Sequence, residues 1–245
     1  MTTGLLLPTE RFATPRTASA LRAYPTPARI THREPPARRI LNVLVAAVGI
    51  VLTLPLMCAV AALIRLTSRG PVLFTQLRIG LDRRALSRAG GNTRRHIDWG
   101  GRAFVMYKFR TMYTDDRQAG GEVWARPGDP RVTPVGRFLR SCRLDELPQL
   151  FNVLKGDMNV VGPRPEQPTI FVQLREQIEG YQRRQRVRPG ITGWAQINLR
   201  YDRTIEDVRT KVAFDLEYIR RQSGREDLLI MLRTLPVMLF RRGGW

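Results

Sequence analysis

Lysine, histidine and cysteine are all scarce in this chain of 245 residues. The 41 basic residues outnumber the 21 acidic ones, which gives a formal net charge of +20. Only three of the basic residues are lysines, so nearly all of the positive charge is carried by arginine. The planar guanidinium suits phosphate in nucleic acid, in lipid headgroups or in a nucleotide substrate. The two cysteines, Cys58 and Cys142, are too few for a disulfide framework and lack metal-ligand spacing, which favours a reducing compartment.

Long apolar runs are also rare, and the sequence contains one. Residues 40–64 carry no charged side chain, and as a helix they would extend roughly 37 Å, enough to cross a bilayer. Pro55 lies inside the run and should kink such a helix. Arginines flank both ends, which suits a helix that enters and leaves the membrane on one face. From the residues alone, a re-entrant helix and a kinked transmembrane helix are equally good interpretations.

The rest of the chain divides around this run. Residues 1–38 are rich in proline and arginine without an apolar pattern, and they predict a disordered basic tail with no removable signal peptide. We predict a membrane helix over 39–66 and a folded domain over 67–245. Residues 88–102 are polar and Gly-rich and predict a loop, whose role is open. The apolar stretch 228–240 is too short to span and suits an interfacial helix, with a core helix as the alternative.

Strand-like composition marks residues 104–112. Lys108 and Arg110 alternate there with Tyr107 and Phe109, so the two cations are expected on one face of the strand. Two cations on one face could clamp a diphosphate. An ordinary exposed sheet face would have the same pattern.

The densest pattern lies in residues 144–165. Asp145 and Glu146 precede an apolar helical pattern, so one interpretation is a helix that begins close to Asp145, with Asp145 as its N-cap and Gly156 as its stop. The same geometry supports chemistry, because one carboxylate could attack phosphorus while the other holds Mg²⁺. Arg164, fixed between two prolines, would present a guanidinium rigidly to an anion.

Four blocks resemble the bacterial sugar transferase family, the monotopic phosphoglycosyl transferases that act on polyprenyl phosphate. They are GPVLFTQLRIG at 70–80, YKFRTM at 107–112, LDELPQLFNVLKGDMNVVGPRP at 144–165 and RPGITGWAQIN at 188–198. The resemblance extends from about residue 40 to the C-terminus. It implies an α/β monotopic membrane protein with one proline-broken re-entrant helix, a mainly helical cytoplasmic catalytic domain and interfacial helices.

The resemblance also implies a reaction. Such enzymes move a sugar-1-phosphate from a nucleotide diphosphate sugar to undecaprenyl phosphate at the cytoplasmic face of the bacterial inner membrane, which initiates a lipid-linked glycan such as an exopolysaccharide. Matched to this sequence, Asp145 would form a covalent phosphosugar intermediate and Glu146 would bind Mg²⁺. The basic groups around the phosphates would be Lys108, Arg110, Arg143, Arg164 and Arg188.

This sequence departs from the family at the helix break. The family has a Ser-Pro pair, whereas Leu54 precedes Pro55 here and Thr53 could substitute for the serine. Residues 1–38 contain neither the extra membrane helices nor the extra domain of larger members, so we expect the minimal catalytic form.

Two other functions remain open at this stage. A membrane-tethered, non-catalytic protein could use its arginines to bind anionic lipid or nucleic acid, although no nucleic-acid-binding motif accompanies the charge. An aspartyl-phosphate phosphohydrolase would use water as the acceptor. The sequence does not indicate the sugar, the nucleotide or the glycan pathway, and it leaves homo-oligomerisation open.

Overall fold

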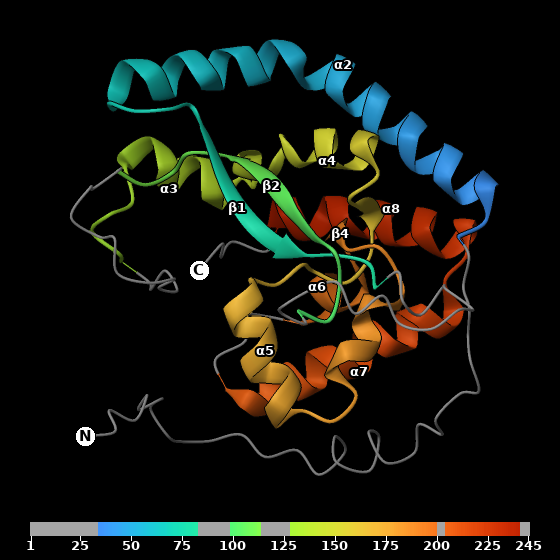
Figure 1. Cartoon of the computed structure of the whole chain (residues 1–245). Helices are drawn as coiled ribbons and strands as arrows, with labels where there is room; N and C mark the ends of the chain where they lie inside the picture. Colours follow the sequence, from blue (N-terminus) through green and yellow to red (C-terminus); the bar gives the residue numbers. More distant parts are fainter. Residues whose placement is uncertain (1–33, 83–98, 114–127, 200–203, 241–245) are drawn as a thin grey trace, which may run out of the picture.

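The structure of the chain is a computed structural model, which describes residues 34–82, 99–113, 128–199 and 204–240. Helices and short strands are mixed along the chain (Figure 1). In order they are α2 (Pro36–Thr67), β1 (Leu73–Ile79), β2 (Ala103–Phe109), α3 (Pro134–Ser141), the 3-10 turn η2 (Leu144–Glu146), α4 (Gln149–Lys155), β3 (Asn159–Val161), α5 (Pro168–Gln177), the 3-10 helix η3 (Tyr181–Arg186), β4 (Gly190–Thr192), α6 (Trp194–Asn198), α7 (Ile205–Arg221) and α8 (Gly224–Phe240).

The apolar run forms α2, a helix of 32 residues that bends near its middle and extends over the rest of the fold (Figure 1). It begins at Pro36, inside the range 1–38 that the sequence assigned to a tail. The fixed φ of proline suits the first helical turn, where its missing N–H costs nothing. The remainder of that range, residues 1–33, lies outside the described residues.

One face of α2 packs on the domain along its whole length, both before and after Pro55. The buried side chains are Arg38, Asn42, Ala46, Met57, Val60 and Ile64. The opposite face exposes large apolar side chains, among them Val51 at 71% and Leu52 at 74% exposure. Exposing so large an apolar face to water is unfavourable, so α2 indicates membrane association.

Pro55 has no N–H, so one carbonyl of the preceding helical turn is left without a donor. The Thr53 hydroxyl does not donate to this carbonyl and so does not replace the serine there. That carbonyl belongs to Val51, four residues earlier. The Thr53 hydroxyl donates instead to the Gly49 carbonyl at 2.7 Å. Such a bond to the preceding turn tends to bend a helix, so Thr53 and Pro55 act together on the same stretch of α2.

The strands β1 and β2 form an antiparallel hairpin beneath α2, in register from Leu73 opposite Phe109 to Ile79 opposite Ala103. Phe104 and Met106 of β2 pack with α2 and α4 in one buried cluster. Asn152 of α4 fixes the strand further, since its Oδ1 accepts from Tyr107 N at 3.0 Å and its Nδ2 donates to Val105 O at 2.7 Å. These bonds set the position of Lys108, the next residue along the strand.

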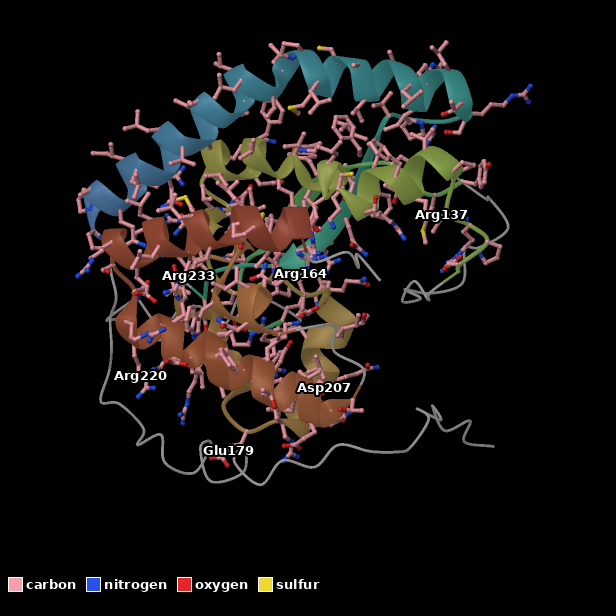
Figure 2. All side chains as sticks on the ribbon, turned by 180° about the vertical axis from the view of Figure 1, so that it is seen from behind. Arg137, Arg164, Glu179, Asp207, Arg220 and Arg233 are labelled. Atoms are coloured by element: carbon pink, nitrogen blue, oxygen red, sulfur yellow. The ribbon has the colours of Figure 1, made fainter. Side chains whose placement is uncertain are left out.

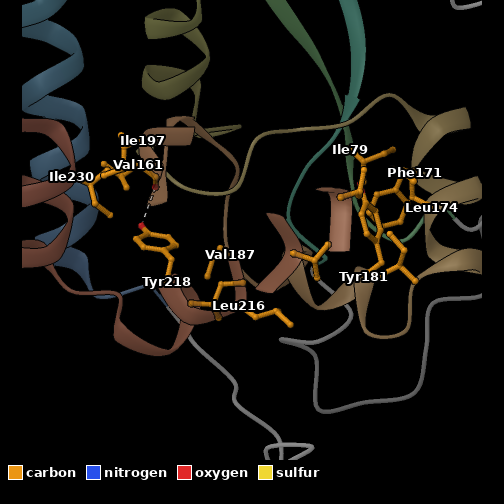
Figure 3. Close-up of a cluster of buried hydrophobic side chains, with 14 residues drawn as sticks. Ile79, Val161, Phe171, Leu174, Tyr181, Val187, Ile197, Leu216, Tyr218 and Ile230 are labelled. Carbon is orange, nitrogen blue, oxygen red and sulfur yellow. Dashed lines mark hydrogen bonds between the residues drawn. The ribbon is translucent and has the colours of Figure 1, made fainter. Parts of the chain in front are cut away.

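The largest core lies around the second sheet, in which β3 and β4 pair in parallel. Side chains from β1, α5, η3, α7 and α8 fill it, as Figure 3 shows. The Tyr218 hydroxyl donates to the Val161 carbonyl at 3.1 Å and ties α7 to β3. Buried within this region, Arg184 donates to Asp215 at 2.6 Å.

The C-terminal apolar stretch belongs to α8, which begins earlier than predicted, at Gly224. Leu228, Leu232 and Leu235 are at least half exposed, while Ile230 is fully buried in the core. The helix therefore combines the two predicted alternatives, with one face in the core and one apolar face outward. Residues 88–98 of the predicted loop lie outside the described residues.

Candidate active site

A backbone turn at Arg143 sets the direction of the two adjacent acids. Arg143 has φ +57° and ψ +18°, the left-handed region, and it connects α3 to the 3-10 turn that holds Asp145 and Glu146. The prediction that a helix begins close to Asp145 is wrong for the α-helix, which begins at Gln149 after Pro148. Asp145 is not its N-cap, because Pro148 takes that position. Gly156 ends α4 at φ +84°, as predicted.

Glu146 is the centre of a cluster of cations. Its Oε1 lies 3.0 Å from Lys108 Nζ, 2.7 Å from Arg164 Nη2 and 3.9 Å from Arg143 Nη1. Figure 2 shows Arg164 at the centre of the fold, whereas Arg137 and Arg220 lie toward its edges. Burial raises the pKa of Glu146, but Arg164, Lys108 and Arg143 outweigh it and hold that pKa well below its ordinary value. Glu146 is therefore an ionised carboxylate.

Asp145 has a different environment from its neighbour. The residue is 8% exposed, and none of the described residues donates a hydrogen bond to it. Its nearest cation is Lys108 Nζ, 3.9 Å from Oδ2. Burial raises the pKa of Asp145 above its ordinary value, with Lys108 opposing and Glu146 adding to the rise. A poorly solvated carboxylate of raised basicity is a better nucleophile than one held by several donors.

Two of the predicted phosphate-binding residues lie outside this cluster. The strand β2 ends at Phe109, so Arg110 leaves the face that Lys108 occupies and donates instead to Ser68 O and Oγ, both at 2.8 Å. Arg188 donates through Nε to Gly156 O at 2.9 Å and through Nη1 to the Glu34 carboxylate. Among the described residues, the cluster at Asp145 and Glu146 thus contains Lys108, Arg143 and Arg164.

The structure adds residues that the sequence reasoning missed. Arg140 of α3 donates to Thr111 Oγ1 at 2.8 Å, and its charge also lowers the pKa of Asp145. Its spacing of three residues from Arg143 could have indicated a shared helical face. Phe74 of β1 lies directly opposite Lys108 in the hairpin and is 47% exposed, which places an open aromatic ring beside the cluster.

The oxygen atoms available to a metal are few. Within the described ranges, no group of three or more His, Cys, Asp or Glu side chains gathers in one place. Mg²⁺, however, is commonly held by one or two carboxylates together with waters and phosphate oxygens. The cations of Glu146 all gather on Oε1, so Oε2 accepts no hydrogen bond from the described residues. The donor set therefore fits Mg²⁺ bound through Glu146.

The fold and the site together define a class: a mixed helix and strand domain, with two adjacent carboxylates among clustered cations, joined to one long apolar helix. Among the described elements, α2 is the helix long and apolar enough to cross a membrane by length and composition. Residues 33–241 match the model of the bacterial sugar transferase family. The chain therefore belongs to the bacterial sugar transferase family, a family of bacterial membrane enzymes.

Curated relatives carry transferase names. The chain is 43% identical over 202 residues to a UDP-N-acetylgalactosamine-undecaprenyl-phosphate N-acetylgalactosaminephosphotransferase of Aeromonas hydrophila, covering 82% of this chain and 43% of the relative. It is 40% identical over 200 residues to a UDP-glucose:undecaprenyl-phosphate glucose-1-phosphate transferase of Escherichia coli, covering 81% and 39%. For the Caulobacter vibrioides protein of that name, the identity is 42% and the coverage 82% and 69%. The chain thus spans about two fifths of the first two relatives.

Proposed function

We propose that this chain transfers a sugar-1-phosphate from a nucleotide diphosphate sugar to undecaprenyl phosphate and so initiates a lipid-linked glycan. The observation that carries the proposal is the pair of adjacent carboxylates whose pKa values are shifted in opposite directions, upward for Asp145 and downward for Glu146. Asp145 is buried without a hydrogen-bond donor among the described residues, while Glu146 is ionised by Lys108, Arg143 and Arg164. The names of the relatives supply the substrate class.

The reaction divides into two displacements at one phosphorus atom. A carboxylate oxygen of Asp145 attacks the sugar-bearing phosphorus, the bond to the bridging oxygen breaks, and a nucleoside monophosphate leaves. The product is a mixed anhydride between Asp145 and the sugar phosphate. A phosphate oxygen of the polyprenyl phosphate then attacks the same phosphorus and releases the carboxylate. Lys108 and Arg164 stabilise the negative charge that the phosphate oxygens carry in both steps.

Glu146 is the residue proposed to hold Mg²⁺, through the oxygen that its cations leave unengaged. A bound Mg²⁺ neutralises charge on a diphosphate and makes its nucleoside monophosphate a better leaving group. Lys108 and Arg164 share Glu146 Oε1, so they keep this carboxylate ionised and fixed in orientation.

We further propose that α2 is re-entrant and that the domain lies on the cytoplasmic face of the inner membrane. Near its start, Arg38 donates to Asp227 of α8 at 2.6 Å; just after its end, Ser68 accepts from Arg110. Both ends are thus held by the same polar domain, which cannot occupy both sides of a bilayer. The arginines at both ends favour the cytoplasmic side.

The transfer is tested by nucleoside monophosphate release from purified full chain with Mg²⁺ and undecaprenyl phosphate. The panel contains UDP-N-acetylgalactosamine, UDP-glucose and other nucleotide sugars. Because the first displacement can release one equivalent without lipid, we expect multiple-turnover release to require both metal and lipid. In Asp145→Asn it should fall at least about 10³-fold, because the nucleophile is lost. Asp157→Asn is the matched control, since Asp157 is a partly buried carboxylate of the same domain outside the cluster.

Two outcomes would contradict the proposal. Release of more than one equivalent per protein without lipid would indicate hydrolysis by water. Silence across UDP-, GDP- and dTDP-sugars, together with salt-sensitive lipid binding that survives Asp145→Asn, would favour the non-catalytic binding protein.

A further inference from the structure

A cavity of about 310 Å³ lies at the N-terminal end of α2, and the reaction above does not use it. It is large enough for a small ligand. Its polar lining residues lie on or directly beside α2, β3, η3 and α7. They are Glu34, Arg38, Arg39, Asn159, Arg186, Arg188 and Gln222. We call it the arginine pocket. Within the described residues, none of these side chains forms a hydrogen bond or ion pair with Asp145 or Glu146.

The arginine pocket carries more positive charge than its own acids balance. Arg38 is paired with Asp227, and Arg188 is paired with Glu34. Within the described ranges Arg39 donates only to backbone carbonyls, including Val153 O at 2.7 Å. Arg186 has no hydrogen-bond or ion-pair partner among the described residues. Two guanidinium groups therefore remain without a carboxylate, which favours an anionic ligand.

A buried acceptor in the same pocket indicates a second property of the ligand. Asn159 is 1% exposed, and its Nδ2 donates to Glu34 Oε1 at 2.7 Å. Its Oδ1 is buried and finds no donor within the described part of the chain. A buried acceptor without a donor destabilises the fold, so a ligand that brings a hydroxyl donor would recover this loss. The pocket is thus complementary to a ligand that carries both an anionic group and a hydroxyl group.

The location of the pocket points to the source of that molecule. Arg39 lines it, and the next residue, Ile40, begins the uncharged run and is 58% exposed. The boundary between polar domain and apolar helix face is where lipid headgroups lie when α2 is in a membrane. Burial, with the neighbouring charge of Arg183, lowers the pKa of Arg186, as expected for a cation that awaits an anion.

We propose that the arginine pocket binds a phosphate ester that carries hydroxyl groups, supplied by the headgroup of an anionic lipid of the phosphatidylglycerol type. The phosphate lies between Arg39 and Arg186, and a glycerol hydroxyl donates to Asn159 Oδ1. The Glu34 carboxylate shares the pocket and weakens the binding by repulsion. This site goes beyond the proposed transferase reaction, since the lipid is neither donor nor acceptor of the sugar phosphate.

The test is calorimetric titration of the detergent-solubilised full chain with dihexanoyl phosphatidylglycerol, dihexanoyl phosphatidylcholine and glycerol 1-phosphate. We expect saturable binding of phosphatidylglycerol that is at least tenfold tighter than that of either other probe. Arg186→Gln should weaken it about tenfold or more, since a charge-assisted hydrogen bond is lost. Glu34→Gln should strengthen it several-fold, a change of sign that mere loss of structure would not produce.

Arg183→Gln is the matched control, because Arg183 lies on the same 3-10 helix outside the pocket and its loss changes the net charge equally. It should leave the affinity within twofold, and Asp145→Asn should do the same. Equal losses in Arg186→Gln and Arg183→Gln would overturn the site in favour of general attraction. Equal affinity for phosphatidylcholine would overturn it as well. Binding of glycerol 1-phosphate as tight as that of the lipid would overturn the lipid source.

Discussion

Arg143 is the residue whose backbone conformation orients the two carboxylates. Among the described residues it is the non-glycine residue with a positive φ. A side chain in this region costs about 1–2 kcal/mol, because Cβ approaches the following carbonyl. The strain turns the chain just before Asp145, and the Arg143 guanidinium adds its charge to the cluster at Glu146. Strain at such a position is typical of active sites.

Removing the strain should be measurable against a matched loss of charge. Arg143→Gly and Arg143→Gln both remove the guanidinium. Only glycine adopts the left-handed conformation without steric cost, because it has no Cβ. We expect Arg143→Gly to be more stable than Arg143→Gln by about 1 kcal/mol. Chemical unfolding of both variants in the same detergent measures the difference, and equal stabilities would show that the turn stores no strain.

At the scale of the element, α2 is held to the domain by a buried ionic contact. Arg38 is 6% exposed and donates to Asp227 Oδ2 at 2.6 Å, to Gln222 Oε1 at 2.6 Å and to the Tyr218 hydroxyl. A contact across 189 residues of sequence thus fixes the start of an otherwise apolar helix. It acts together with the bond from Arg39 to the Val153 carbonyl and with the apolar packing of the helix.

A double-mutant cycle would test how strongly this contact acts. Arg38→Met or Asp227→Leu alone leaves a buried charge without its partner, which should cost about 3–5 kcal/mol. The double variant should cost clearly less than the sum of the two. Unfolding free energies of the four proteins give the coupling, and additive effects would show that Arg38 and Asp227 act independently.

The position of α2 makes a second prediction, about topology. Ala37→Cys and Thr67→Cys would place one thiol at each end of the helix, where both residues are exposed, in a background of Cys58→Ser and Cys142→Ser. If α2 is re-entrant with a cytoplasmic domain, an impermeant maleimide should label neither thiol in intact spheroplasts and both after permeabilisation. A helix that spans the membrane would expose one of them in intact spheroplasts.

For the molecule as a whole, an ionic network around Glu166 joins distant parts of the chain. Lys211 of α7 lies 2.9 Å from its carboxylate, and Arg184 of η3 and Arg78 of β1 each lie 3.9 Å away. Burial alone would raise the pKa of Glu166, but Lys211, Arg184 and Arg78 lower it to about 2. Because the folded state binds this proton less readily than the unfolded chain, the network stabilises the fold above the ordinary pKa of glutamate.

This stabilisation should disappear as the pH falls from about 4.5 toward 2. At neutral pH it amounts to about 3 kcal/mol, from a lowering of about 2.5 pKa units. Glu166→Gln should therefore reduce stability at pH 7 and flatten its dependence on pH below 4.5. Glu179→Gln, at an exposed position, is the control and should match the native protein. If the stability of Glu166→Gln fell between pH 4.5 and 2 as steeply as that of the native protein, this network would be excluded as the source of the acid sensitivity.

Local patterns in the sequence were enough to predict the apolar helix and the stop at Gly156, whereas the roles of Asp145 and Glu146 came from the family resemblance and stay a prediction. The helix and the stop each depend on residues within a few positions of one another. The start of α7 is also set locally, because Thr204 and Asp207 form a capping box there. Such features are encoded locally because hydrogen bonds and apolar periodicity act within a turn or two.

The tertiary structure alone decided which cations surround the carboxylates. Lys108 and Arg164 both bond to Glu146, although they lie 38 and 18 residues away from it in the sequence. Arg110 is only two residues after Lys108, but it lies beyond the end of β2 and outside the cluster. The arginine pocket likewise joins residues from α2, β3 and η3. These neighbours follow from strand ends, register and helix packing, which are long-range consequences of burying apolar surface. The sequence by itself therefore determined the long apolar helix and the adjacent acids Asp145 and Glu146, and the fold determined the electrostatic surroundings of these acids.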